Sequence, residues 1–177
     1  MQRRLLLTAA VATPLVMAGC ASPQMSDFAG EKPVLDLAHY FSGVIDGYGM
    51  FQDRSGHVVK RFTVVMNCSW QGNKGILDEA FTYSDGTKER RVWTLIRGEN
   101  GSYTGTAGDV VGVAQGQTSG NAFHWNYTLN LPVDGKTWEV QLDDWMYLID
   151  ERIMLNRATM SKFGVRVGDL TLSFTKR

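Results

Sequence analysis

The sequence has few of the residues from which reactive sites are usually built. Among its 177 residues are 2 cysteines, 3 histidines and 4 prolines. The histidines, His39, His57 and His124, are far apart and fit no metal-binding spacing. The serines include no Gly-x-Ser-x-Gly elbow, and no Gly-Lys-Ser/Thr pattern follows the glycines, which argues against a serine hydrolase and a phosphate loop. We therefore expect no catalytic residues, no metal and no cofactor, and we predict that the protein is not an enzyme.

Neither sign of charge prevails. The 18 lysines and arginines balance the 18 aspartates and glutamates, so the formal net charge is zero. Proteins that bind nucleic acid usually carry a clear excess of positive charge on one face. The composition therefore argues against nucleic acid as a partner, and it names no protein partner.

The N-terminus has the three parts of a bacterial signal peptide. Two arginines at residues 3–4 precede an apolar stretch over residues 5–17, which is shorter than the roughly 20 residues that a membrane-spanning helix needs. The stretch ends in Met-Ala-Gly-Cys, and small residues before a cysteine resemble the lipobox of bacterial lipoproteins. We predict a signal peptide over residues 1–19 and a lipid on Cys20. The alternative is an ordinary secretory signal that happens to contain a cysteine.

A lipid on Cys20 would attach the protein to a membrane. Each buried methylene contributes about 0.8 kcal/mol to membrane binding, so several acyl chains anchor a protein stably, whereas a single chain does not. Ala21 follows the cysteine in place of the aspartate that, by resemblance, retains lipoproteins in the inner membrane. We expect the periplasmic face of the outer membrane. Lipidation would leave Cys68 without a disulfide partner. Residues 20–33 would form the lipidated N-terminus and a tether, and residues 34–177 a single domain.

From residue 34 onward the dominant pattern is an alternation of apolar and polar residues, which is typical of strands. The clearest examples run over residues 58–70 and 123–131. Turn-forming pairs and quartets, such as Asp85-Gly86 and Asp134-Gly135, separate these runs. We predict an all-β fold: an antiparallel, up-and-down barrel of about 8–10 strands. A sandwich is the alternative, but closure into a barrel removes exposed edges.

Charged residues interrupt the apolar faces at a few positions. Asp143 and Asp144 are neighbours on one predicted strand, so they face opposite ways, and the alternation over residues 138–148 places Asp144 inside. Glu79 shares an apolar face with Phe81 in the same manner. These positions predict carboxylates in the barrel interior.

The loop that follows Glu79 decides whether Arg91 joins the two carboxylates. With a three-residue loop over residues 85–87, Glu79 lies opposite Trp93 and Arg91 also faces inward, whereas a two-residue loop reverses the second strand. In the first register Glu79, Arg91 and Asp144 form an interior polar cluster. Buried charges need partners, so the cluster is either a structural salt bridge or a group that orients a bound molecule.

Aromatic side chains dominate the predicted inner faces. A barrel of this size holds either its own side chains or one small ligand, so the sequence leaves core packing and pocket lining open for each of them. Cys68 lies on the same faces and is expected to be an inert buried thiol. The candidate aromatic residues are Phe62, Trp70, Phe81, Trp93, Trp125, Tyr127 and Trp138.

Short motifs spread over nearly the whole mature chain resemble the bacterial lipoprotein family catalogued as domain of unknown function 3833. The resemblance implies a lipocalin-like barrel on a lipid anchor and brings no catalytic residues. The motifs are Phe41-Ser42-Gly43, Gly47-Tyr48-Gly49, Phe81-Thr82-Tyr83-Ser84-Asp85-Gly86, Arg91-Val92-Trp93, Tyr103 with Gly105, Asp109-Val110-Val111-Gly112, Asp143-Asp144-Trp145-Met146 and Lys162-Phe163-Gly164.

Two functional hypotheses follow. The first is a lipid-anchored periplasmic carrier or sensor that holds a lipid, a fatty-acyl chain or another small apolar molecule in the barrel. The second is an envelope structural or interaction protein with a packed, ligand-free barrel that presents its loops to a partner.

Overall fold

The computed structural model describes residues 22–133 and 135–177. The predicted signal peptide and Cys20 lie outside these residues. The described residues form two short helices, η1 and α1, and ten strands, β1 to β10. Their bounds are η1 Met25–Phe28, α1 Leu37–Tyr40, β1 Gly43–Asp53, β2 Val58–Gln71, β3 Lys74–Tyr83, β4 Lys88–Arg97, β5 Ser102–Thr106, β6 Ala114–Ser119, β7 Ala122–Val133, β8 Lys136–Leu148, β9 Ile153–Lys162 and β10 Val165–Lys176.

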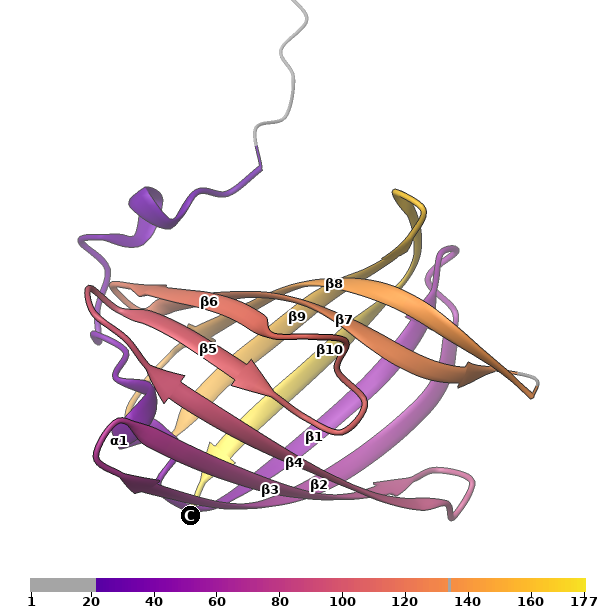
Figure 1. Cartoon of the computed structure of the whole chain (residues 1–177), viewed down its shortest axis with the longest axis horizontal. Helices are drawn as coiled ribbons and strands as arrows, with labels where there is room; N and C mark the ends of the chain where they lie inside the picture. The colour runs from indigo at the N-terminus through magenta and orange to yellow at the C-terminus, as the bar shows by residue number, and fades with distance from the viewer. Residues whose placement is uncertain (1–21, 134) are drawn as a thin grey trace, which may run out of the picture.

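The strands form a closed, antiparallel, up-and-down barrel (Figure 1). Each strand pairs with the next one along the chain, and β1 also pairs with β10, so that Ile45 lies opposite both Met66 and Lys176. The hydrogen bonds between the first and last strands close the sheet, so neither β1 nor β10 is a free edge. The prediction of a lipocalin-like barrel is therefore confirmed.

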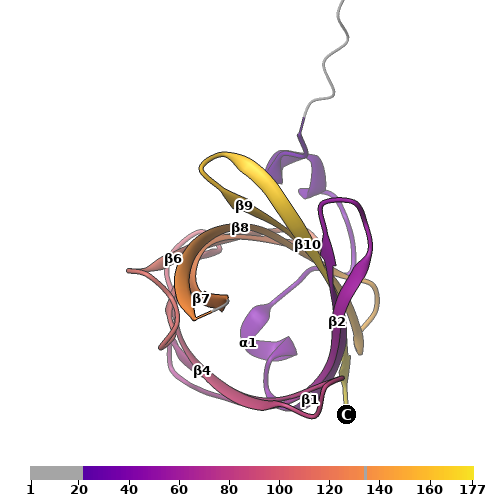
Figure 2. The ribbon, with the colours of Figure 1, turned by 90° about the vertical axis from the view of Figure 1, so that its right-hand side faces the viewer.

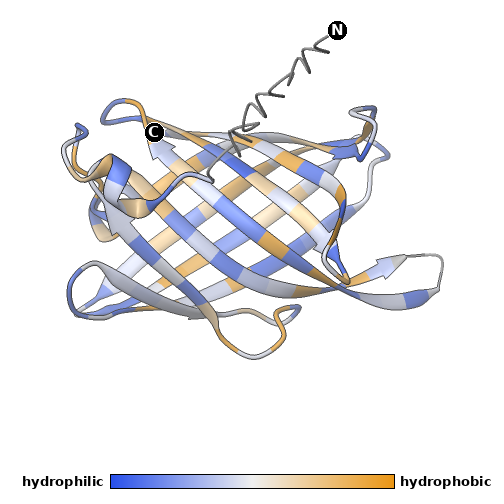
Figure 3. Ribbon diagram, turned by 90° about the horizontal axis from the view of Figure 1, so that it is seen from above, coloured by the Kyte–Doolittle hydropathy of each residue, from blue (hydrophilic) through white to orange (hydrophobic). Residues whose placement is uncertain are grey.

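Alternation along the strands separates the inside of the barrel from the outside. In β2, Phe62, Val64 and Met66 are buried, while Thr63 and Val65 between them are exposed. The same period of two is visible as alternating colours along the strands in Figure 3. Successive side chains of a strand point to opposite faces, so the sequence pattern itself sets which residues fill the interior.

Two glycines let large inward side chains lie close to the wall of the barrel. A Cβ atom at Gly49 would overlap the ring of Phe62 on the neighbouring strand, and one at Gly116 would overlap the rings of Phe123 and Trp125. Glycine is therefore required at these positions because the aromatic rings occupy the space of a side chain.

The helix α1 closes one end of the barrel. Asp36 caps it by accepting hydrogen bonds from the backbone N–H groups of Ala38 and His39. The side chains of Leu37 and Tyr40 are buried, and the Tyr40 hydroxyl donates to the carbonyl of Arg152 at 2.9 Å. In Figure 2, which looks into the opposite end, α1 is seen within the ring of strands. Among the described residues, α1 therefore covers one end of the barrel and no helix covers the other.

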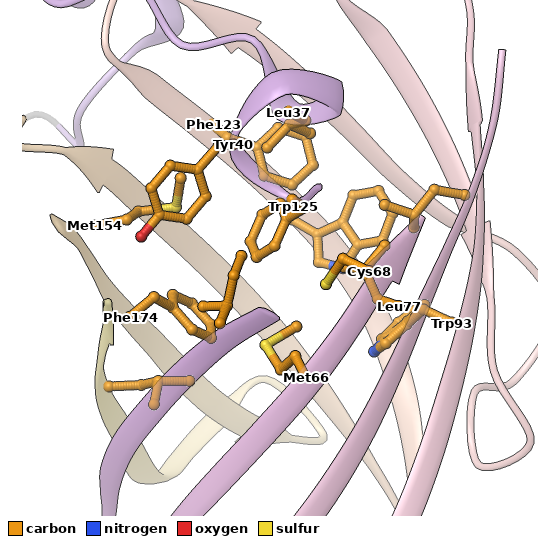
Figure 4. Packing of buried hydrophobic residues seen from close by; sticks show 14 of the residues in the cluster. Leu37, Tyr40, Met66, Cys68, Leu77, Trp93, Phe123, Trp125, Met154 and Phe174 are labelled. Atoms are coloured by element: carbon orange, nitrogen blue, oxygen red, sulfur yellow. The ribbon is translucent and has the colours of Figure 1, made fainter. Parts of the chain in front are cut away.

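Aromatic and sulfur-containing side chains pack densely beside α1 (Figure 4). The rings of Phe123 and Trp125 lie 5.1 Å apart, and Trp93 lies 5.5 Å from Trp125. Aromatic pairs at such separations stabilise a core beyond the area that they bury. Trp70 is half-buried at the edge of this cluster, where its indole N–H donates to the carbonyl of Phe41 at 2.9 Å. Trp70 therefore packs against the core cluster.

The segment before α1 lies against the outside of the barrel. The helix η1 places the ring of Phe28 5.6 Å from that of Trp145 and 5.5 Å from that of Tyr147. The N–H of Leu35 donates to the carbonyl of Gly120 at 2.8 Å. The described part of the predicted tether thus packs on the wall. Neither described helix is long and apolar enough to cross a membrane.

The loop between β3 and β4 differs from the predicted one by a single position. It spans Ser84 to Gly86, because the N–H of Tyr83 donates to the carbonyl of Thr87 at 2.9 Å. Gly86 has a φ of +83°, the left-handed conformation that three-residue hairpin loops place last. Glu79 consequently lies opposite Arg91, and Phe81 opposite Glu89. The predicted pairing of Glu79 with Trp93 was therefore wrong. The predicted inward direction of Arg91 was right, because the pairing shifted by two residues along β4 and a shift by an even number leaves each side chain on the same face.

Trp138 does not belong to the barrel interior, so its prediction as a core or pocket residue was wrong. It pairs with Leu131 near the tip of the β7–β8 hairpin and is 39% exposed. The neighbouring strand β9 pairs with β8 from Gln141 onward, so Trp138 lies beyond the closed part of the wall. The ammonium group of Lys162 covers its ring from 3.2 Å.

Candidate functional site

A cavity of about 100 Å³ lies in the barrel interior. We call it the inner cavity. Its lining includes the three predicted polar residues Glu79, Arg91 and Asp144, joined by Asn156 of β9. Five of the seven predicted aromatic residues also line it, namely Phe62, Phe81, Trp93, Trp125 and Tyr127. An apolar pocket with a few convergent polar groups is the usual form of a small-molecule site.

Glu79 and Arg91 come together because they lie directly opposite each other on β3 and β4. Glu79 is 8% exposed, and its Oε2 atom lies 3.9 Å from Nη1 of Arg91. That oxygen is buried and has no hydrogen-bond partner among the described residues. A buried carboxylate oxygen with an incomplete set of partners is costly.

Arg91 is held more closely by a residue that the sequence did not indicate. Its Nε and Nη2 atoms both donate to Asp109 Oδ2, at 2.9 and 2.6 Å. Asp109 lies in the loop between β5 and β6, whose backbone joins β7: the N–H of Asn130 donates to the carbonyl of Asp109 at 2.8 Å. The pair therefore links β4 to β7 through the loop.

Asp144 is satisfied by neighbours of its own. It is 2% exposed, and it accepts hydrogen bonds from the Tyr127 hydroxyl at 3.0 Å and from the amide of Asn156. The Asn156 amide also donates to the carbonyl of Trp145 at 3.0 Å. The structure thus brings Asp144 into the same cavity as Glu79 and Arg91 but ties it to β7 and β9.

Burial changes the acidity of the cluster. It is the largest influence on Glu79, whose pKa rises to about 7 although the Arg91 guanidinium opposes the change. Burial likewise raises the pKa of Asp144 to about 6, against the hydrogen bonds from Asn156 and Tyr127. Burial alone would lower the pKa of Arg91, but Glu79 and Asp109 outweigh it and raise that pKa. The guanidinium is therefore always charged, whereas the carboxylates titrate near neutrality.

A larger hollow of about 590 Å³ adjoins the inner cavity. We call it the vestibule. Arg91, Tyr127 and Phe81 line both spaces and so lie at the boundary between them. The vestibule is also lined by the charged residues Glu89, Arg90 and Asp109. Its apolar lining includes Leu129, Leu131, Pro132, Leu142, Met160 and Leu170. These residues come from the strand ends that lie away from α1.

The other reactive residue types lie apart from this site. The thiol of Cys68 is buried in the core, and burial raises its pKa to about 12, so it is a poor nucleophile. His57 is exposed beside a turn, and His124 is on the outer wall, where its Nε2 atom lies 2.6 Å from Asp143 Oδ1. Among residues 22–133 and 135–177, no group of three or more potential ligands is placed to hold a metal ion.

Two of the polar residues at the site escaped sequence reasoning. Asn156 occupies a buried position of β9, in alternation with the buried residues Met154 and Ala158. The sequence did not fix the register of the last strands. Asp109 lies outside the strands, where no periodic signal exists. The hydroxyl of Tyr127 is a further case, since alternation gave its direction but not its partner.

Comparison with solved structures shows barrels of the same kind. The S-type phycobiliprotein lyase from Guillardia theta matches with a TM-score of 0.60 at 9% identity, over 88% of this chain and 98% of that one. A protein of unknown function from the DUF3598 family of Nostoc punctiforme matches with a TM-score of 0.57 at 10% identity, over 83% of this chain and 51% of that one. At these identities the likeness is one of fold.

Among curated proteins, none matches the chain. A family model does match, and it spans residues 14–176, which include every described strand. Because the match covers more than half of the chain, it shows that the chain belongs to the family described as "Protein of unknown function (DUF3833)".

Proposed function

We propose that this protein is a lipid-anchored protein of the periplasmic face of the outer membrane, and that its barrel binds one small, largely apolar molecule as a carrier or sensor. The observation that carries the binding role is the inner cavity, which combines aromatic walls with a buried carboxylate oxygen that has no hydrogen-bond partner among the described residues. The anchor is proposed from the Met-Ala-Gly-Cys ending of the N-terminal apolar stretch. The role is binding without catalysis.

The two hollows suggest how such a molecule would lie. The inner cavity, at about 100 Å³, is smaller than a typical ligand pocket of about 300–1,000 Å³. The vestibule, at about 590 Å³, falls within that range. One end of the ligand would therefore enter the inner cavity beside the polar cluster, and its apolar remainder would occupy the vestibule.

Binding can be tested on the whole mature chain, residues 20–177, carrying Cys20→Ser so that it stays free of lipid. We expect N-phenyl-1-naphthylamine, a neutral apolar dye, to gain fluorescence with saturable, one-to-one binding. Leu142→Trp should fill the vestibule and reduce affinity at least about tenfold, because the added ring competes for the same space. Val113→Trp, at an exposed position, serves as the matched control. Native mass spectrometry of the untreated protein would reveal a co-purifying ligand.

The alternative is an envelope structural or interaction protein with a packed, ligand-free barrel. It is favoured by the small size of the inner cavity and by the hydrogen bonds that Arg91 already makes to Asp109. Absence of both dye binding and a co-purifying molecule would support this alternative and exclude the carrier.

A further inference from the structure

The inner cavity has an acidic balance. Of the described residues that line it, Glu79 and Asp144 are acidic and Arg91 is basic. Arg91 is also neutralised from outside the inner cavity, because two of its nitrogens donate to Asp109. The guanidinium therefore has little positive potential to offer a ligand, whereas Oε2 of Glu79 has no hydrogen-bond partner among the described residues.

We propose that the site selects amphiphiles with a cationic amine head group over those with a carboxylate head group, and that Glu79 is the residue that makes this selection. The inference rests on the proposed function and names the class of molecule that the barrel takes. The amine would lie in the inner cavity against Glu79 Oε2, and the alkyl chain would lie in the vestibule.

An ammonium group suits the geometry of the cavity. It carries three donors and no acceptor, so it can donate to Glu79 Oε2, which lacks a partner among the described residues. A hydrogen bond between two charged groups is roughly twice as strong as a neutral one, and the surrounding aromatic walls reduce screening by water. Aromatic faces such as that of Trp93 also attract cations.

A carboxylate head group meets the opposite situation. To reach Arg91 it would have to displace Asp109 from Nε and Nη2, and Nη1 lies 3.9 Å from Glu79. In the inner cavity it would also face Glu79 and Asp144, and like charges at close range repel strongly in a poorly screened interior. A free fatty acid is therefore a poor fit for this cavity, whatever the length of its chain.

The preference should depend on pH through Glu79. An amine with a pKa near about 10 stays charged at neutral pH, whereas Glu79, with its pKa raised to about 7, gains charge as pH rises. Affinity for the amine should therefore increase from pH 6 to pH 8, and binding should release protons. Besides burial, Arg91 lowers the pKa of Glu79, whereas Asp109, Asp144 and Asp78 raise it. The ionisable groups that Glu79 itself influences are Tyr127 and Cys68.

Three ligands with the same chain and different heads provide the test: dodecylamine, dodecanol and dodecanoate. Each would displace N-phenyl-1-naphthylamine from the mature Cys20→Ser chain at pH 6 and pH 8, below its micelle-forming concentration or, for dodecanol, below its solubility limit. We expect dodecylamine to bind at least about tenfold more tightly than dodecanoate at pH 8, as expected for a charge-assisted contact. Glu79→Gln should abolish this preference, and dodecanol, whose head group is uncharged, measures the contribution of the alkyl chain.

Asp78→Asn is the matched control, because Asp78 is the adjacent residue on β3 and its carboxylate faces outward to Arg90. It should keep the preference for the amine. Near-ultraviolet circular dichroism would verify that each variant is folded. Equal or tighter binding of dodecanoate, or an unchanged preference in Glu79→Gln, would overturn the inference while leaving the carrier function standing. Failure of all three ligands and of the dye to bind would reject both.

Discussion

Glu79 and Asp144 are unusual residues because they are carboxylates placed where the strand pattern calls for apolar side chains. Asp144 has the partners that its burial demands, from Tyr127 and Asn156. Glu79 has Arg91 at 3.9 Å and one oxygen without a hydrogen bond among the described residues. A buried acid with an unsatisfied oxygen costs folding free energy. We therefore expect Glu79 to serve a role other than stabilising the folded barrel.

At the residue scale, Glu79→Gln should make the unfolding free energy less dependent on pH. The pKa of Glu79 is raised from 4.5 to about 7 in the folded state, so the folded protein holds a proton that the unfolded chain has lost, and stability falls as pH rises through this window. We expect Glu79→Gln to be more stable than the wild type at pH 8 by up to about 3 kcal/mol, and the difference to vanish towards pH 4.

Urea unfolding between pH 4 and pH 8 would measure this difference. Asp78→Asn should show no such gain at pH 8, because the hydrogen bond from Arg90 lowers the pKa of Asp78. A Glu79→Gln variant that is less stable than the wild type at pH 8 would mean that the ion pair with Arg91 outweighs the cost of burial.

At the scale of elements, the barrel wall depends on a loop where two strands are short. β4 pairs with β5 over Thr94 to Arg97, so the first half of β4 has no strand beside it on that side among the described residues. The loop between β5 and β6 fills the space, with Val110 bridging to Leu129 of β7 and Asp109 bonding to Arg91. This loop therefore completes the wall beside the site.

Asp109→Asn should loosen that part of the wall. The change removes the negative charge that pairs with Arg91. Because both side chains of this pair are partly buried, we expect a loss of about 1–2 kcal/mol in unfolding free energy. Hydrogen exchange at the backbone N–H groups of Val111 and Asn130 should accelerate. Asp78→Asn removes a comparable pair with the largely exposed Arg90 and should cost less. Equal losses in the two variants would contradict the importance assigned to the loop.

At the scale of the whole molecule, the two ends of the barrel differ. One end is closed by α1, which buries Leu37 and Tyr40, and the other leads through the vestibule to the inner cavity. The described N-terminal segment runs along the outer wall, where Phe28 contacts Trp145 and Tyr147. A lipid attached at Cys20 would therefore be carried by a chain that approaches the wall of the barrel and not its open end.

The anchor itself is predicted from the sequence and can be tested in the native host. We expect radiolabelled palmitate to be incorporated into the wild-type protein and into Cys68→Ser, but not into Cys20→Ser. The wild type should fractionate with the outer membrane, because several acyl chains hold a protein in a bilayer. A soluble, unlabelled wild-type protein would reject the lipid anchor, whereas labelling of Cys20→Ser would place the lipid elsewhere.

The sequence by itself determined the fold class and the direction of most side chains. Alternation with a period of two is a local property, so it correctly predicted that Glu79 and Asp144 face inward and that Asp143 faces outward. It placed Phe62, Trp93 and Trp125 in the interior for the same reason. The series of hairpins allowed either a barrel or a sandwich, and the barrel was predicted because closure removes exposed edges.

Tertiary structure decided what alternation cannot express. Which residues meet across strands depends on turn geometry, and the loop at Ser84 to Gly86 set Glu79 against Arg91. Whether an inward position is buried depends on how far the neighbouring strand extends. β9 pairs with β8 only from Gln141 onward, so Trp138 is exposed. Asp109 reached Arg91 through a loop that follows no periodic rule. These outcomes depend on contacts between residues far apart along the chain, and such contacts exist only once the sheet has closed.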